Sequence, residues 1–463
     1  MNSIRKVAVF GLDCAEPSLV FDRWRDDLPH LRGLMERGTW GQLTSCIPPI
    51  TVPAWSCMTS SCDPGALGIY GFRNRADHSY DKLSIATSLA VRYPRLWNIL
   101  TDHDRDSIIV GVPGTYPITR PVRGCLITSF LTPDINAEYT WPPALKKEIA
   151  DLVGEYMLDV RDFRTDDKQW LLRQIYEMTD KRFTVANHLL ESRPWDLFFM
   201  VEMGVDRIHH GFWSFMAVDH HRYAPGNPFE NAIHDYYVHV DGLIGKALTR
   251  IDAETTAIWV VSDHGARTMI GGFCLNTWLM NEGYLHLKNP PKPGQKFDVK
   301  EVDWSRTTAW GDGGYYGRVF LNVRGREPQG VVSRDGYESV RDEIKRKLEA
   351  LPDHQGRPMG NVAHRPGDLY KQSNGVPPDL IVIFGELAWR SVGTVGNESV
   401  YTFENDTGPD DANHAQQGMY ILARPGGAAA GRRDASIYDV APTILGMLGL
   451  PIPGHVRGRS LPP

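Results

Sequence analysis

The chain has 463 residues, of which 42% are hydrophobic and 23% are charged, and its formal net charge is −6. This length predicts one large domain with insertions or two domains, and a mild negative charge without a basic block excludes a nucleic-acid polymer or a membrane surface as the expected partner. No run approaches the ~18 apolar residues of a membrane span, and residues 1–10 do not resemble a signal peptide. We therefore expect a cytoplasmic globular protein, and we expect most of its six cysteines to be buried thiols.

The N-terminal part of the chain alternates strand and helix patterns. Residues 6–11 form a continuous apolar run, which predicts a buried strand, and Asp13 follows directly. An acidic residue just past a buried strand lies where open α/β sheets place their chemistry, although a helix cap is an equal alternative. Residues 28–38 predict a short amphipathic helix, and 40–44 predict a strand that leads into a loop rich in proline.

Prolines at positions 48, 49 and 53 stiffen the loop around Thr51. Each proline fixes its own φ and disfavours the α region for the residue before it, and Pro53 suits the first turn of a helix. Thr51 is therefore expected near a helix N-terminus, where backbone N–H groups favour an anion. The loop alone favours a helix cap. The alternative, a nucleophile aimed at a phosphate-like group, depends on carboxylates and histidines elsewhere.

Strand and helix patterns continue to alternate along the rest of the chain. Strands are expected at 107–112, 195–201, 257–261, 378–384 and 419–423, and helices at 95–100, 170–190, 236–248, 337–351 and 441–449. This alternation predicts a doubly wound, mostly parallel α/β sheet. Two segments depart from it, and we expect 133–193 to form an inserted helical cap and 290–330 to form a second insertion near the site.

Three features supply the oxygen and nitrogen ligands that borderline metals bind. Asp206 and His210 are four residues apart, one helical turn, and lie on one face of a helix. Asp263 and His264 directly follow a buried strand, and His414 lies in a polar loop ahead of the last strand. Each feature is weak alone, but strand ends gather at one sheet edge, so together they indicate a metal site.

With Asp13 and Thr51, this pattern resembles the alkaline phosphatase superfamily, within it the type I phosphodiesterase/nucleotide pyrophosphatase branch, and most of all its bacterial phosphohydrolase- or phosphomutase-like proteins. The matching stretches follow the family order along the chain and are 11–13, 48–55, 63–69, 206–213, 262–265, His414 and 438–443. The resemblance implies one alkaline phosphatase-like catalytic domain over residues 1–463.

The resemblance also implies two divalent metal ions, Zn²⁺ with Mn²⁺ or Fe as alternatives, and a small organic phosphate as substrate. One ion would be held by Asp13, Thr51, Asp263 and His264, and the other by Asp206, His210 and His414. The four-residue spacing favours His210 over the adjacent His209. Thr51 would be the nucleophile and would form a phospho-threonine intermediate.

The residues around Thr51 fit a phosphodiesterase or nucleotide pyrophosphatase best. The alternatives are a phosphomonoesterase, phosphomutase or phosphonate-ester hydrolase, and, least favoured, a binding protein without activity. The asparagine that holds a phosphate oxygen in nucleotide pyrophosphatases aligns near Phe72, so Asn74 or Arg73 is the candidate for that contact. The sequence leaves the oligomeric state and the native metal open.

Overall fold

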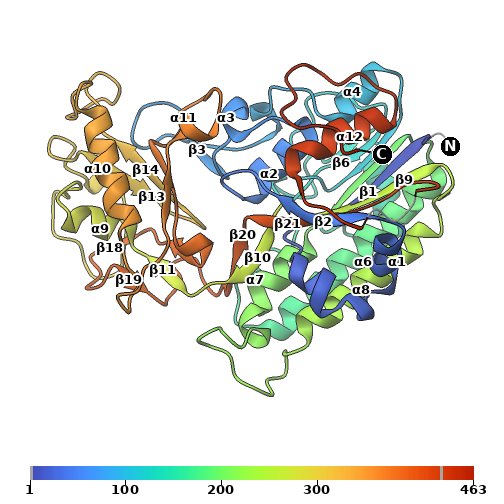
Figure 1. Ribbon diagram of the computed structural model, residues 1–463, viewed down its shortest axis with the longest axis horizontal. Coiled ribbons are helices and arrows are strands. Elements are labelled where there is room, and N and C mark those ends of the chain that lie inside the picture. Colours follow the sequence, from blue (N-terminus) through green and yellow to red (C-terminus); the bar gives the residue numbers. More distant parts are fainter. Residues whose placement is uncertain (1–3, 428–430, 463) are drawn as a thin grey trace.

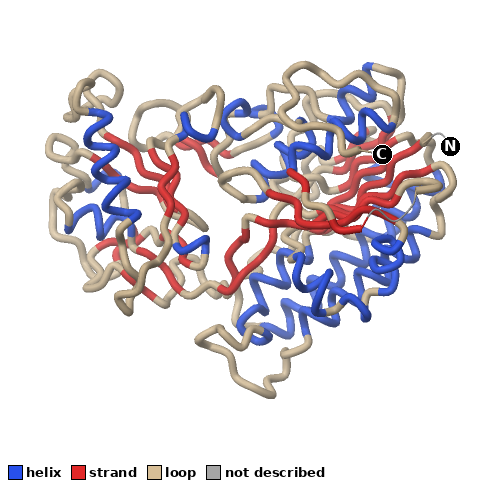
Figure 2. The backbone as a smooth tube through the Cα atoms, in the orientation of Figure 1, coloured by secondary structure: helices blue, strands red, loops and turns tan. Residues whose placement is uncertain are grey.

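The computed structural model describes residues 4–427 and 431–462. Over these residues its centre is a ten-stranded sheet in the order β22-β2-β21-β9-β1-β8-β5-β6-β7, with β23 beside β2 (Figures 1 and 2). The parallel strands are β9 (Thr256–Val261), β1 (Lys6–Leu12), β8 (Leu197–Glu202), β5 (Ser107–Val110) and β6 (Gly124–Ile127). The predicted mostly parallel α/β sheet is confirmed.

Antiparallel strands extend this sheet on both sides. They are β21 (Gln417–Ala423) and β2 (Gly38–Thr44) beyond β9, and β7 (Thr140–Trp141) beyond β6. Two short strands, β22 (Gly431–Arg432) and β23 (Ala435–Ser436), run parallel to β2. The return of β21 beside β9 brings the short strand before it, β20 (Ala412–Ala415), to the same sheet edge as Asp263. His414 lies in β20, which pairs with β10 (Gly265–Thr268), so the polar loop expected around it is a strand.

Helices cover both faces of the sheet, which explains why its central strands are apolar without alternation. Figure 1 shows α1 (Pro29–Glu36), α6 (Lys168–Ser192), α7 (Gly204–Met216) and α8 (Ala232–Leu248) on one face, and α2 (Thr51–Ser60), α4 (Leu96–Asp102) and α12 (Val440–Met447) on the other. None of the described helices is long and apolar enough to cross a bilayer.

The long helix α6 differs from the helical cap predicted for 133–193. It packs against β5, β8, α7 and α8, and its apolar residues belong to the main hydrophobic core. Its amphipathic pattern indicates a helix with one buried face but cannot say which surface buries that face. Of residues 133–193, only Asp159, Phe163 and Arg164, ahead of α6, line the cavity beside Thr51.

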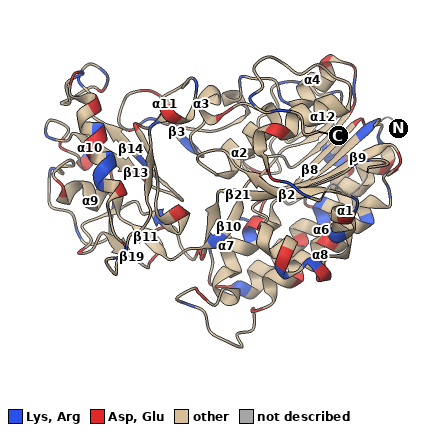
Figure 3. Cartoon of the chain, in the orientation of Figure 1, with Lys and Arg blue, Asp and Glu red and all other residues tan. Residues whose placement is uncertain are grey.

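A second lobe lies between β11 (Gly271–Phe273) and β19 (Tyr401–Thr402), so it is much wider than the insertion predicted at 290–330. It has its own apolar core and a sheet in the order β13-β14-β16-β15. Its main elements are α9 (Leu275–Asn281), β13 (Ala309–Asp312), β14 (Gly317–Leu321), α10 (Tyr337–Glu349), β15 (Val362–His364) and β16 (Leu380–Ile383). The strand expected at 378–384 is β16, and it therefore lies in this lobe and not in the central sheet. Acidic and basic residues are mixed along the outer helix α10 (Figure 3).

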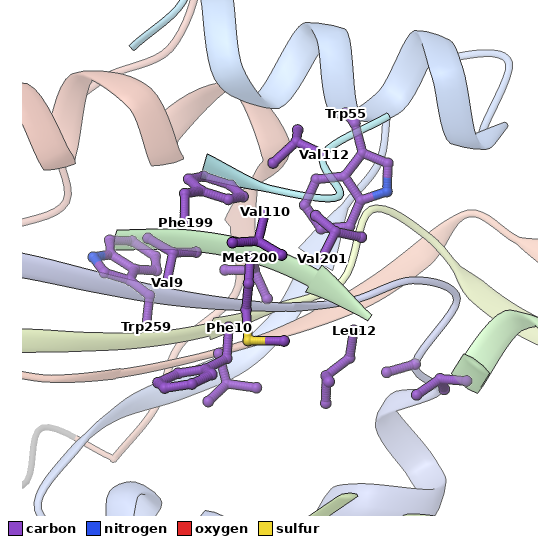
Figure 4. Close-up of a cluster of buried hydrophobic side chains, with 14 of the residues drawn as sticks. Val9, Phe10, Leu12, Trp55, Val110, Val112, Phe199, Met200, Val201 and Trp259 are labelled. Carbon is purple, nitrogen blue, oxygen red and sulfur yellow. The ribbon is translucent and has the colours of Figure 1, made fainter. Parts of the chain in front are cut away.

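Helix α2 packs closely on the sheet. Trp55 of α2 is fully buried over β1 and β8, close to Val112 and Val201 (Figure 4). A Cβ atom on Gly11 would lie 2.6 Å from the Trp55 ring and 2.9 Å from the Met200 carbonyl oxygen. Glycine at this position therefore lets α2 approach the strand whose end carries Asp13.

Candidate metal centre and active site

The ends of two adjacent parallel strands bring Asp13, Asp263 and His264 together. Asp13 follows β1, and the other two residues follow β9. His264 Nε2 lies 3.2 Å from Asp263 Oδ2 and 3.8 Å from Asp13 Oδ1. One ligand atom from each of the three residues lies within 4.8 Å of the others, and all three side chains are buried. The sheet edge thus forms the first of two candidate ligand groups.

Thr51 is the first residue of α2, and Ile50 occupies the N-cap position without a side-chain cap. The Thr51 side chain is 3% exposed, and its Oγ1 lies 3.4 Å from His264 Nε2. The alternative that Thr51 caps the helix is therefore wrong. Its hydroxyl instead faces the first ligand group from the N-terminus of a helix.

The second group combines α7 with β20, the short strand before β21. Asp206 Oδ1 lies 3.2 Å from His210 Nε2 and 3.9 Å from His414 Nε2, and the two histidine Nε2 atoms are 3.4 Å apart. His264 joins this group too, because its ligand atom lies within 4.8 Å of those of Asp206 and His414. The neighbouring His209 is placed elsewhere, with Nε2 3.1 Å from the Tyr237 hydroxyl.

The polar atoms of both groups fit divalent cations. Within the described residues, Asp13 Oδ1, Asp206 Oδ1 and Asp263 Oδ2 are buried without a hydrogen-bond donor, an arrangement that is costly unless a cation compensates it. Burial raises the pKa of the Asp13 carboxyl well above its usual range, and the nearby Asp206 carboxylate raises it further. Mixed carboxylate and imidazole ligands suit Zn²⁺ and similar ions.

Each histidine of the centre uses Nδ1 for an acceptor outside it. His210 Nδ1 donates to Asp410 Oδ1 (2.7 Å), His414 Nδ1 to the Pro49 carbonyl oxygen (2.9 Å) and His264 Nδ1 to the Gly265 carbonyl oxygen (3.1 Å). These bonds leave Nε2 as the lone-pair atom facing the carboxylates, which is how metal-binding histidines are commonly oriented. Burial lowers the pKa of His264 to about 4, which keeps its ring neutral.

Comparison with known proteins identifies the chain. The model of the type I phosphodiesterase / nucleotide pyrophosphatase family matches residues 7–410. The chain belongs to this family. It is accordingly a phosphoester hydrolase of the phosphodiesterase/nucleotide pyrophosphatase type, a class of enzymes that carries two metal ions. No curated protein sequence matches it.

Solved structures show the same fold. Human ectonucleotide pyrophosphatase/phosphodiesterase 5 is 13% identical with a TM-score of 0.55, and the match covers 98% of this chain and 97% of the human one. The murine enzyme of the same name is 13% identical with a TM-score of 0.53, covering 97% and 96% of the two chains. An inactive murine variant in complex with AMP is 14% identical, with the same TM-score of 0.53 and the same coverage of 97% and 96%.

A cavity of about 470 Å³ opens beside Thr51 in this family member. Five arginines line it: Arg73, Arg164, Arg207, Arg318 and Arg390. Its apolar wall contains Phe72, Leu83, Phe130, Phe163 and Met203. A larger cavity of about 760 Å³ is lined by residues 45–47 and by none of the predicted metal ligands. Cavity size alone would therefore not identify the candidate active site.

The two predicted substrate contacts differ in position. Arg73 lines the cavity. Asn74 does not, because its Oδ1 accepts from the Tyr70 N–H (2.8 Å) and its Nδ2 donates to the Gly71 carbonyl oxygen (3.0 Å). The Asn74 amide holds the loop that bears Arg73, and its role as a substrate contact stays a prediction.

Sequence reasoning missed the residues that support the ligands. Trp55 Nε1 donates to Asp13 Oδ2 (2.6 Å), and Asp410 accepts from His210 as described above. Asp410 also accepts from Arg164 Nε (3.0 Å) and the Tyr315 hydroxyl (3.2 Å). The only local signal was the polar loop before His414. The contact between Arg164 and Asp410 has no counterpart in the sequence pattern.

Proposed function

We propose that this family member cleaves esters of a small organic phosphate, preferably a diester, with Thr51 as nucleophile and a phospho-threonine intermediate. The observation that carries the proposal is the position of the Thr51 hydroxyl. It stands at the N-terminus of α2, 3.4 Å from His264 Nε2, where backbone N–H groups favour a bound anion. The cavity of about 470 Å³ beside it has room for a small substrate.

Two divalent ions, Zn²⁺ in preference to Mn²⁺ or Fe, belong to this proposal. Seven residues would hold them: Asp13, Thr51, Asp263 and His264 for one ion, and Asp206, His210 and His414 for the other. When bound, such ions lower the pKa of a coordinated hydroxyl and offset the charge that gathers on the phosphate oxygens. The buried carboxylate oxygens without donors support this assignment.

The chain itself supplies the nucleophile and its orientation. Thr51 Oγ1 would lose its proton to solvent and attack phosphorus, so that an Oγ1–P bond forms. The bond from phosphorus to the leaving oxygen breaks, and that oxygen keeps the electron pair. Water would then attack the phospho-threonine, release the phosphate group and return a proton to Oγ1. Trp55 would hold Asp13 in place during both steps, and Asp410 would hold His210.

A phosphomonoesterase, with a phosphomutase or phosphonate-ester hydrolase as variants, is the second candidate. The observation that favours it is the set of five arginines along the cavity. Guanidinium groups suit phosphate oxygens, and a monoester dianion offers more negative charge to them than a diester monoanion does.

Hydrolysis of bis-p-nitrophenyl phosphate and of p-nitrophenyl phosphate tests the proposal. The wild type, Thr51→Ala and the control Thr59→Ala would be compared after chelation, with and without added Zn²⁺ or Mn²⁺. Thr59 is a buried threonine of the same helix, and its hydroxyl donates to the Trp55 carbonyl oxygen (2.8 Å) and not to the site.

Metal-dependent diester cleavage that disappears only in Thr51→Ala is the expected result. A preference for the monoester with the same dependence would favour the second candidate. Activity that survives in Thr51→Ala would refute the role of Thr51 as the nucleophile. The absence of both activity and bound metal in the wild type would refute the proposed metal-dependent hydrolysis.

A further inference from the structure

Arg164 lies on the wall of the catalytic cavity and is held from several sides. Its Nε donates to Asp410 Oδ2 (3.0 Å) and its Nη2 to the Tyr315 hydroxyl (2.6 Å), while its guanidinium lies 4.5 Å from the centre of the Phe163 ring. Its side chain is 28% exposed. Burial disfavours the charged form, but Tyr315 and Asp410 outweigh it and keep the pKa of Arg164 above its usual value. The guanidinium is thus a fixed positive charge.

One terminal nitrogen of Arg164, Nη1, has no partner among the described residues. It is also not among the buried polar atoms that lack a partner, so it keeps solvent-accessible surface on a side chain that lines the cavity. A guanidinium held by two hydrogen bonds and one aromatic face, with a free N–H pair on an open cavity, is organised in advance to bind an anion.

The other arginines of the cavity are less suited to this role. Arg207, Arg318 and Arg390 each use both terminal nitrogens for protein acceptors. Arg73 has no side-chain partner among the described residues and is exposed, so it would lose more side-chain entropy on binding. Arg164 alone among the five combines an anchored guanidinium with a free donor.

The position of Arg164 also connects it to the metal centre. Asp410, whose Oδ2 accepts from Arg164, uses its Oδ1 for His210 Nδ1 (2.7 Å). His210 Nε2 lies 3.2 Å from Asp206 Oδ1. One buried carboxylate therefore separates the guanidinium from a predicted ligand of the phosphate-binding centre.

We propose that Arg164 Nη1 binds an anionic oxygen of the phosphate that Thr51 attacks, while Arg164 Nε keeps Asp410 aligned with His210. This inference rests on the proposed function and assigns a phosphate contact to a residue that lines the cavity, which Asn74 does not. Arg164 would give the site a fixed positive charge next to the phosphate oxygens. Removal of that charge should therefore weaken phosphate binding even if the metal ions stay in place.

Calorimetric binding of inorganic phosphate to the metal-loaded protein tests this role. The variants are Arg164→Ala, Arg164→Lys and the control Arg161→Ala, which removes an exposed arginine of the same segment whose Nη2 donates to the Pro133 carbonyl oxygen (3.1 Å). Bound metal is measured in every sample. Phosphate is used because it carries the oxygens in question without a leaving group.

Arg164→Ala is expected to raise the Kd for phosphate about tenfold to a hundredfold, the effect of one charge-assisted hydrogen bond. Arg164→Lys should restore part of the affinity, since it keeps the charge but loses the fork, and Arg161→Ala should bind like the wild type. With Zn²⁺ added in excess, all three variants should carry as much metal as the wild type, so that a change in Kd reports the phosphate contact and not the alignment of Asp410 with His210.

Two results would overturn the inference. One is a Kd for Arg164→Ala within twofold of the wild type with metal retained. The other is loss of metal from Arg164→Ala with normal phosphate affinity once metal is restored, which would make Arg164 a positioning residue only. Failure of the proposed function can be distinguished from failure of this inference. If the proposed function is wrong, the wild-type protein itself will cleave neither nitrophenyl ester.

Discussion

Replacement of Asp410 by asparagine tests how the protein orients a predicted metal ligand. Asp410 is 2% exposed and accepts three hydrogen bonds, from His210 Nδ1 (2.7 Å), Arg164 Nε (3.0 Å) and the Tyr315 hydroxyl (3.2 Å). The asparagine side chain would keep one acceptor oxygen and replace the other with an NH₂ group. That group would face at least one N–H or O–H donor with no lone pair to offer.

The main loss is expected at His210. Arg164 and Tyr315 both donate to Oδ2 and only His210 donates to Oδ1, so the amide oxygen is expected on the Arg164 side and the NH₂ group opposite His210 Nδ1. The ring then loses the bond that holds its proton at Nδ1 and leaves Nε2 free for a cation. Removal of such a supporting acceptor typically lowers metal affinity about 10- to 100-fold, which corresponds to about 1.4–2.7 kcal/mol at tenfold per 1.4 kcal/mol. Asp410→Asn should therefore weaken one of two ion-binding steps and leave the other nearly unchanged.

Competition for Zn²⁺ with a chromophoric chelator measures this effect, with Asp411→Asn as the matched control. Asp411 is also buried in the same loop, but its Oδ2 accepts from the Ser214 hydroxyl (2.6 Å) and not from a histidine. Equal affinities in the wild type and Asp410→Asn would refute the reasoning. So would an equal loss in both variants, which would indicate a general effect of the loop charge.

Three further substitutions test other parts of the site. His210→Gln should lower Zn²⁺ affinity at least about tenfold, whereas His209→Gln should retain it because His209 faces Tyr237; equal loss in equilibrium dialysis would contradict the assignment. Asn74→Ala should lower the free energy of unfolding in urea by about 1–3 kcal/mol by leaving a buried backbone N–H unpaired, and a raised KM at unchanged stability would instead make it a substrate contact. Gly11→Ala should cost about 1–3 kcal/mol in the same assay through overpacking against α2; an unchanged midpoint would show that α2 shifts without strain.

The central sheet and the candidate metal ligands at its edge can be predicted because their sequence signals are local. A buried parallel strand is a continuous apolar run, and the residue after it lies at the carboxyl edge of the sheet. Asp13 after β1 and Asp263 with His264 after β9 are therefore predictable without knowledge of their partners. The four-residue spacing of Asp206 and His210 is likewise local, and α7 places both side chains at the centre.

The boundaries of the second lobe could not be predicted from local sequence patterns. Residues 378–384 have the apolar pattern of a buried strand, and β16 is one, but its neighbours are β14 and β15. An apolar run indicates that a strand is buried, but it does not indicate which sheet the strand belongs to. The same holds for α6, whose amphipathic pattern fits a cap and a core layer equally well.

The amino-acid sequence by itself determined which side chains are candidates for the chemistry of this phosphodiesterase family member and where the strands that present them end. Only the tertiary structure decided which of those side chains contact one another. The Thr51 hydroxyl faces His264 across 213 positions of the chain, and Arg164 reaches Asp410 across 246. The physical reason is that hydrophobic patterns fix local conformation and burial, whereas a hydrogen bond between distant residues depends on how the layers pack.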